Sequence, residues 1–115
     1  MNNWTYFKQE EVQGLDLELV AMLDRARGLA GVPFVITSGL RTQDQNESLA
    51  NSVKDSSHLT GNGVDLACED STTRFKMLRG IILAGFKRIG VYAKHLHCDN
   101  AASLPQEVCW YIQGD

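Results

Sequence analysis

Apolar residues recur at helical spacing in the first third of the chain. Over residues 15–30 they fall three or four positions apart, and Gly31 follows directly. This spacing places the apolar side chains on one side of a helix, and a glycine just past the last turn is typical of a helix end. A second helix is predicted over residues 71–82, with Ser71 as its cap and Gly85 at its end.

Short runs that are rich in β-branched residues predict strands between and after these helices. Residues 33–38 form the first run, and the apolar alternation over residues 64–68 forms the second. Residues 86–92 and 94–99 are separated by a single position. They therefore predict either an antiparallel pair of strands or one bent strand.

The remaining segments complete an α+β arrangement. Thr42, followed three positions later by Gln45, predicts a short helix, and the polar residues 51–57 predict a surface loop. Residues 108–112 predict either an edge strand or a segment that packs Trp110 on the core. Because the last strands are too close in sequence for helical crossovers, we predict an α+β fold with helices packed on a partly antiparallel sheet.

The composition indicates one soluble domain over residues 1–115. Hydrophobic residues make up 43% of the chain and charged residues 22%, which is typical of globular proteins. The formal net charge is −3 and no cluster of Lys and Arg is present, so we expect no nucleic-acid partner. The chain has neither an apolar run of about 20 residues nor an export signal at its start, so we expect no membrane partner. We also expect a monomer.

The histidines point to a metal site. His58, His95 and His97 all fall in two short segments that also hold Asp65 and Asp99. Zinc binds imidazole nitrogen and carboxylate oxygen, and a catalytic site uses three protein ligands and leaves a position for water. Two histidines and one aspartate would meet this requirement, although a lone His or Asp is more often a surface or capping residue than a metal ligand.

Strand alternation predicts how these side chains are arranged. In residues 94–99, His95, His97 and Asp99 share one face of the predicted strand. Gly63 shares a face with Asp65, at a position where a large side chain would crowd a bound ion. Both histidines of this strand are therefore expected to face the same cleft.

Three motifs in register resemble one family of enzymes. The stretch SSHLTGNGVD, residues 56–65, is similar to the S-x-H-x-x-G-x-A-x-D signature of zinc D-alanyl-D-alanine carboxypeptidases and L-alanyl-D-glutamate endopeptidases, with Gly63 in place of alanine. ITSGLRTQDQN before it and RIGVYAKHLHCDN after it resemble the family's other two segments. The resemblance spans residues 15–100. It implies a fold like that of Hedgehog and DD-peptidase domains.

The resemblance also implies a function and the residues that perform it. The family's zinc ligands correspond to His58, Asp65 and His97, and its substrate-binding arginine corresponds to Arg41. A guanidinium group can hold a peptide carboxylate through two hydrogen bonds. Ser56 is expected to bind substrate or to support the ligands. The implied reaction is zinc-dependent hydrolysis of a peptide bond in a peptidoglycan stem peptide.

One position departs from the family and leaves the general base open. Many members have Glu or Asp three residues before the last zinc histidine, where this chain has Lys94. His95 is our first candidate for proton transfer or oxyanion stabilisation, because strand alternation places it beside His97 and a histidine pKa near 6.5 suits such a role. Asp99 is the second candidate, and it could instead orient His97 through the outer nitrogen of its ring.

Other interpretations remain open at this point. The segment HLHC also resembles the Hedgehog signalling domain, so an inactive, zinc-stabilised binding module is an alternative function. The sequence does not distinguish removal of a terminal D-alanine from cleavage between L-alanine and D-glutamate. Copper or nickel could replace zinc in vitro. The lack of an export signal suggests a phage lysis enzyme that is made in the host cytoplasm. The alternatives are a periplasmic enzyme and a module of a larger phage structure.

The cysteines carry a further hypothesis. Cys68, Cys98 and Cys109 are odd in number and form no C-x-x-C pair, so we expect reduced and mostly buried thiols. A thiol hydrolase that uses Cys98 or Cys68 with a histidine is disfavoured, because strand alternation directs Cys98 away from His97.

Overall fold

The computed structural model describes residues 4–38 and 61–112. The short helix predicted from Thr42 and the loop predicted at residues 51–57 lie outside this range. The elements in chain order are η1 (Gln9–Glu11), α1 (Leu17–Ala30), β1 (Ile36–Ser38), β2 (Gly63–Ala67), α3 (Ser71–Leu83), β3 (Arg88–Val91), β4 (His95–Asp99) and β5 (Val108–Tyr111). The described part of the chain contains no helix that is long and apolar enough to cross a lipid bilayer.

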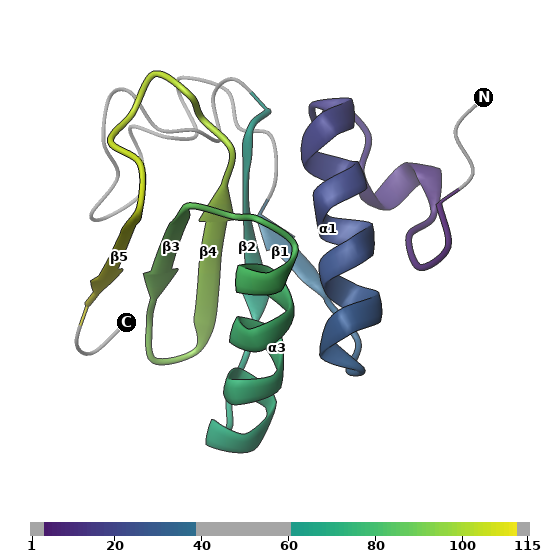
Figure 1. Cartoon of the computed structure of the whole chain (residues 1–115). Coiled ribbons are helices and arrows are strands. Elements are labelled where there is room, and N and C mark those ends of the chain that lie inside the picture. The colour runs from purple at the N-terminus through teal and green to yellow at the C-terminus, as the bar shows by residue number, and fades with distance from the viewer. Residues whose placement is uncertain (1–3, 39–60, 113–115) are drawn as a thin grey trace.

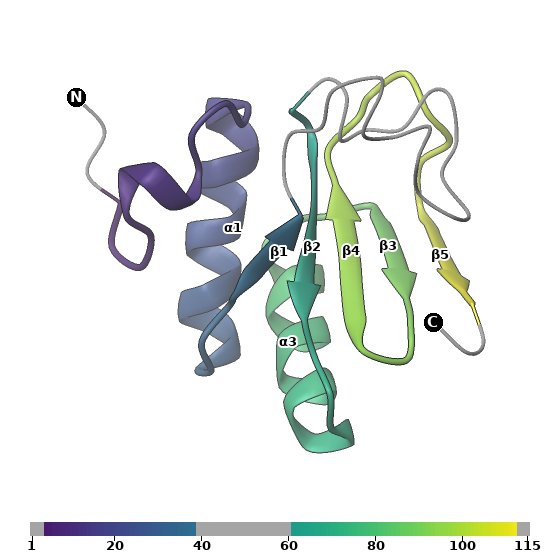
Figure 2. The ribbon, with the colours of Figure 1, turned by 180° about the vertical axis from the view of Figure 1, so that it is seen from behind.

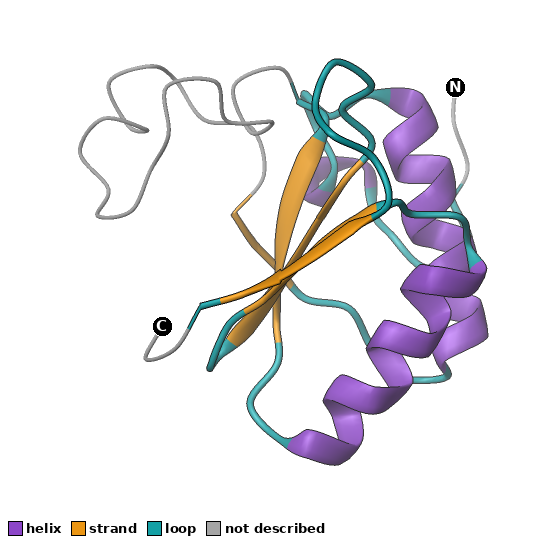
Figure 3. Cartoon of the chain, turned by 60° about the vertical axis from the view of Figure 1, so that its left-hand side comes forward, coloured by secondary structure: helices purple, strands orange, loops and turns teal. Residues whose placement is uncertain are grey.

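The elements form two layers. Figures 1 and 2 show α1 and α3 side by side on one face of the sheet, and the turned view of Figure 3 shows both helices on the same side of the strands. We call the sheet face that is turned away from α1 and α3 the distal face. The predicted α+β fold is confirmed.

Local signals define both ends of α1. The carboxylate of Asp16 accepts a hydrogen bond from the backbone N–H of Leu19 at 3.1 Å and so caps the first turn. Gly31 ends the helix with a φ of 73°, which glycine adopts without steric cost. The buried residues of α1 lie on the side that faces the sheet and α3: Leu19, Val20, Leu23, Ala26 and Ala30.

The cap of α3 differs from the predicted one. Asp70, rather than Ser71, accepts a hydrogen bond from the backbone N–H of Thr73 at 2.9 Å. Asp70 has the extended backbone that a capping residue requires, whereas Ser71 is already the first helical residue. The helix then packs closely on α1, because a Cβ atom at Gly80 would collide with the carbonyl oxygen of Ala26.

The strands of the described residues form one five-stranded sheet in the order β1-β2-β4-β3-β5. The pairs β1–β2, β2–β4 and β3–β4 are antiparallel, whereas β3–β5 is parallel. Of the two arrangements predicted for residues 86–99, the antiparallel pair is therefore the one observed. The predicted C-terminal edge strand is also observed, as β5.

The core lies between the helices and the sheet. Leu66, Leu96 and Cys98 are fully buried on the sheet side, and Leu23 and Ile81 are fully buried on the helix side. Because side chains alternate along a strand, the residues between these inward positions belong to the distal face. This alternation places Asp65, His95 and His97 together on the distal face.

Candidate functional site

Two neighbouring strands bring the main polar side chains together. Asp65 of β2 pairs directly with His97 of β4 across the antiparallel ladder. Directly paired residues have their side chains on the same face and close together. The Oδ1 atom of Asp65 lies 3.0 Å from Nδ1 of His97, although 32 positions separate the two residues in sequence.

His97 lies between two carboxylates. Its Nδ1 contacts Asp65, and its Nε2 lies 2.7 Å from Oδ2 of Asp99. The second oxygen of Asp99 accepts hydrogen bonds from Nε of Arg88 at 2.7 Å and from the backbone N–H of Ala101 at 3.1 Å. An ionised Asp99 can only accept hydrogen bonds, so Nε2 of His97 carries the proton. In the protonated ring Nδ1 also carries a proton and donates to Asp65. In the neutral ring with the proton on Nε2, the lone pair of Nδ1 is available to bind a metal.

The charges of this group support one another. Burial alone would lower the pKa of His97, but its hydrogen bonds with Asp65 and Asp99 outweigh that effect and raise the pKa above its usual value. Burial would raise the pKa of Asp99, yet the hydrogen bond and charge of His97, with the N–H of Ala101 and the charge of Arg88, lower it. The site therefore favours an ionised Asp99 next to an imidazole that readily holds a proton when no metal is bound.

His95 lies on the other side of Asp65. Its Nε2 atom is 3.9 Å from Oδ2 of Asp65, and its side chain is 26% exposed. It therefore has access to solvent, whereas His97 is buried. A proton-transfer role for His95 stays a prediction.

Three further residues surround the histidines, and the sequence assigned none of them to the site. Arg88 and Tyr92 come from β3 and the turn after it, and Trp110 comes from β5. The guanidinium carbon of Arg88 lies 5.2 Å from the centre of the Trp110 ring. The alternation of Arg88, Gly90 and Tyr92 could have indicated that they share a face with His97, but the pairing with β5 could not be read from the sequence.

The structure describes two of the three predicted metal ligands. Asp65 and His97 offer the oxygen and nitrogen donors that zinc accepts, and they lie side by side. His58, Arg41 and Ser56 lie outside the described residues. Within residues 4–38 and 61–112, no group of three or more His, Cys, Asp or Glu side chains is arranged to hold a metal ion. The assignment of His58 as the third ligand stays a prediction.

The cysteines do not support a thiol nucleophile. Cys98 is fully buried in the core, on the opposite side of β4 from His97. Burial raises the pKa of the Cys98 thiol well above its usual value, and burial also raises the pKa of Cys68. A thiol with a raised pKa is a poor nucleophile at neutral pH. All three cysteines are free thiols, and Cys109 is exposed.

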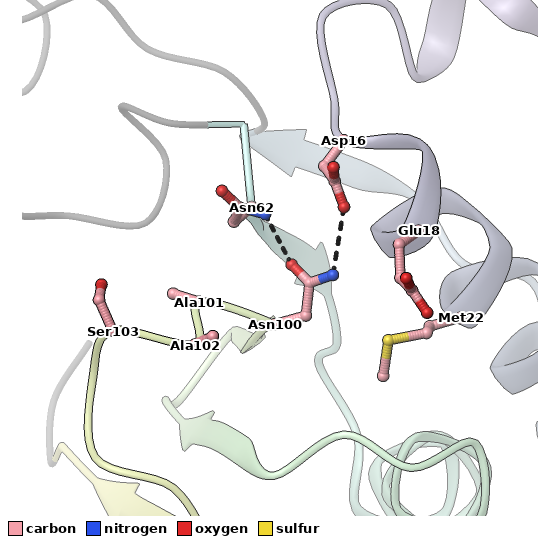
Figure 4. A pocket seen from close by; sticks show the side chains of 8 residues that line it. All are labelled: Asp16, Glu18, Met22, Asn62, Asn100, Ala101, Ala102 and Ser103. Atoms are coloured by element: carbon pink, nitrogen blue, oxygen red, sulfur yellow. Dashed lines mark hydrogen bonds between the residues drawn. The ribbon is translucent and has the colours of Figure 1, made fainter.

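A pocket of about 520 Å³ lies at the end of the same strands. Its lining residues come from the start of α1 and from the ends of β2 and β4: Asp16, Glu18, Met22, Asn62, Asn100, Ala101, Ala102 and Ser103. Figure 4 shows Asn100 at its centre, where it accepts a hydrogen bond from Nδ2 of Asn62 at 2.9 Å and donates one to Asp16 at 3.3 Å. Asp65 and His97 do not line this pocket, so it is distinct from their cluster.

Comparisons with known proteins identify the family and the fold of the chain. A family model described as peptidase M15 matches residues 2–99. The crystal structure of the Serratia marcescens L-Ala D-Glu endopeptidase ChiX is similar, with a TM-score of 0.57 and 18% identity over 78% of this chain and 84% of that chain. No curated protein matches the chain. At this identity the structural likeness establishes a shared fold.

Proposed function

This chain belongs to the peptidase M15 family, and we propose that it is a zinc-dependent peptidase that hydrolyses a peptide bond in the stem peptides of bacterial peptidoglycan. The zinc ligands in this proposal are His58, Asp65 and His97. The observation that carries it is the contact between Asp65 and His97 on the distal face, with Asp99 bound to the outer nitrogen of the His97 ring.

The proposed substrate is supported by the similar solved structure. That protein is named an L-Ala D-Glu endopeptidase, and it shares the fold of this chain. A stem peptide also offers a carboxylate for Arg41, and Ser56 would add a hydrogen bond near the ligands. Both an endopeptidase of this type and a D,D-carboxypeptidase fit these features. The enzyme would act at the cell wall.

Each residue of the site would have a separate chemical role. Bound zinc would lower the pKa of a water molecule and polarise the scissile carbonyl group. Asp99 accepts a hydrogen bond from Nε2–H of His97 and so keeps the lone pair of Nδ1 available to a metal. His95 lies beside Asp65 with its side chain partly open to solvent, where it would exchange a proton with the substrate.

The alternative function is a zinc-stabilised binding module of the same fold. It is favoured by Lys94, which stands where many relatives have an acid and which is exposed in this structure. If His95 does not replace the missing acid, the protein would bind zinc and peptide without cleaving it. Both functions predict bound zinc, so only activity on peptide separates them.

The test is digestion of purified peptidoglycan fragments by the zinc-loaded protein, with and without a chelator, followed by mass spectrometry. We expect products that form only without the chelator, and their mass will identify the bond that is cut. His58→Ala and Asp65→Ala should lose zinc and cleavage together, whereas Lys94→Ala should keep both. Bound zinc without cleavage would refute the peptidase and favour the binding module.

A further inference from the structure

Tyr92 and Trp110 form a hydrogen-bonded aromatic pair beside the two histidines of β4. Nε1 of Trp110 donates to the Tyr92 hydroxyl at 3.0 Å. The Tyr92 ring stacks on His95, with ring centres 4.2 Å apart and 12° between the planes. The Trp110 ring is tilted by 41° against His97, at 5.5 Å between centres. Each histidine therefore has an aromatic neighbour, and one hydrogen bond joins these neighbours.

The contact between Trp110 and His97 depends on a glycine between them. Strand β3 separates β5 from β4 in the sheet, and Gly90 of β3 pairs with Trp110 on one side and with His97 on the other. A Cβ atom at Gly90 would collide with Nε1 and Cε2 of the indole. The indole thus lies over Gly90 and reaches across β3 to the neighbouring strand.

Trp110 also contacts the residues that hold His97. The Arg88 guanidinium carbon lies 5.2 Å from the Trp110 ring centre, and Nε of Arg88 is bonded to Asp99. Asp99 in turn contacts Nε2 of His97. One side chain of the edge strand therefore packs on the His97 ring and also on the arginine that fixes the carboxylate partner of that ring.

We propose that Tyr92 and Trp110 are positioning residues that fix the ring orientations of His95 and His97. A terminal ring torsion such as χ2 of histidine has a broad energy profile, so a partly exposed imidazole needs neighbours to select one orientation. The importance of that orientation for zinc binding and catalysis rests on the proposed function. Trp110 lies beyond residues 2–99, so the family match does not cover this feature.

Conservative variants test the hydrogen bond without removing an aromatic ring. Trp110→Phe removes the donor and Tyr92→Phe removes the acceptor, and Tyr111→Phe is the matched control, because Tyr111 is 70% exposed on the same strand as Trp110. The first readout is the NMR spectrum of the histidine ring protons in the zinc-free protein. The second is zinc affinity, measured by competition with a coloured chelator.

We expect the His95 ring protons to resonate upfield in the natural protein, because the Tyr92 ring stacks on them. Trp110→Phe and Tyr92→Phe should move these signals downfield. They should also weaken zinc affinity by up to about tenfold, which is the lower end of the range of losses seen when residues that support metal ligands are replaced. Tyr111→Phe should change neither. Trp110→Ala should have a larger effect on both.

Unchanged His95 signals in folded Trp110→Phe and Tyr92→Phe would overturn the positioning role. The NMR readout needs neither zinc nor activity, so it separates this inference from the proposed function. If the natural protein cleaves no peptidoglycan and the variants still move the ring signals, the peptidase proposal fails while the positioning role stands. If the protein is active and the ring signals do not move in the variants, the positioning role fails while the peptidase proposal stands.

Discussion

Asp99 shows how a single buried residue can control the site. Its side chain is fully buried, and it accepts hydrogen bonds from Arg88, from the backbone of Ala101 and from His97. Such a carboxylate fixes both the proton and the rotation of a ligand imidazole. Sequence analysis left Asp99 open between a base and an orienting residue. The hydrogen bond to Nε2 of His97 favours the orienting role.

Replacement of Asp99 tests this role. Asp99→Asn keeps the shape of the side chain but removes its charge, so Nε2 of His97 is no longer held as a donor to a carboxylate. We expect zinc affinity to fall about 10- to 100-fold, measured by competition with a chelator. Asp70→Asn is the control, because Asp70 caps α3 and contacts no site residue that the structure describes. An unchanged affinity in Asp99→Asn would contradict the orienting role.

The pKa of His97 predicts how the zinc-free protein responds to pH. The Asp65 and Asp99 contacts raise this pKa above its usual value, against the opposing effect of burial. A raised pKa means that the folded state binds the proton more tightly than the unfolded chain does. The stabilisation is therefore fully present below the unfolded pKa of about 6.5 and is lost as pH rises through the folded pKa.

We accordingly expect the free energy of unfolding of the chelator-treated protein to decrease as pH rises above about 6.5. Urea unfolding at several pH values measures this change. His97→Gln should make the unfolding free energy depend less on pH, because the group that titrates is then absent. An equally steep pH dependence of the unfolding free energy in His97→Gln would show that another group causes it.

At the scale of elements, the antiparallel pairing of β2 with β4 assembles the site. The register sets Gly63 opposite Asp99, Asp65 opposite His97 and Ala67 opposite His95. The histidines and Asp99 of β4 thus face one carboxylate and two small residues on β2. A slip of one residue in this register would move Asp65 to the core face of the sheet.

The two helices support this sheet through a close crossing at Gly80. An added Cβ would collide with the Ala26 carbonyl oxygen, and backbone atoms cannot rotate away. We expect Gly80→Ala to destabilise the protein by about 1–3 kcal/mol, despite the higher helix propensity of alanine. Thermal or urea unfolding measures the loss.

Gly28→Ala on α1 is the matched control for Gly80→Ala. The nearest atoms there belong to the Tyr6 side chain, at 3.2 Å, and Tyr6 is 46% exposed and so has room to move. This variant should be close to neutral or slightly stabilising. Equal losses in the two variants would show that the close helix contact does not set the stability.

At the scale of the whole molecule, the proposed ligands join distant parts of the chain. Asp65 and His97 come from two strands, and His58 precedes the first of them by several residues. A metal that binds only the folded chain stabilises it by mass action, by about 2.7 kcal/mol at 100 times the dissociation constant. We expect zinc to raise the thermal midpoint and a chelator to reverse the effect. Asp65→Ala should show no such shift.

Much of this architecture was accessible from local sequence patterns. The spacing of apolar residues predicted α1 and α3, and the alternation in residues 94–99 predicted which side chains of β4 share a face. Helical and strand periodicity are properties of a few adjacent residues, so a single sequence can reveal them. The sequence also determined the types of donor available for a metal and the resemblance to the peptidase family.

The tertiary structure decided which of these residues meet. The contact of Asp65 with His97, the link from Arg88 to Asp99 and the reach of Trp110 across Gly90 all join different strands. Such pairings depend on how the whole sheet packs on α1 and α3, and no local pattern specifies that β5 runs parallel to β3. The sequence determined the elements and their chemical groups, whereas long-range packing determined the site, because side chains far apart in sequence meet only in the folded chain.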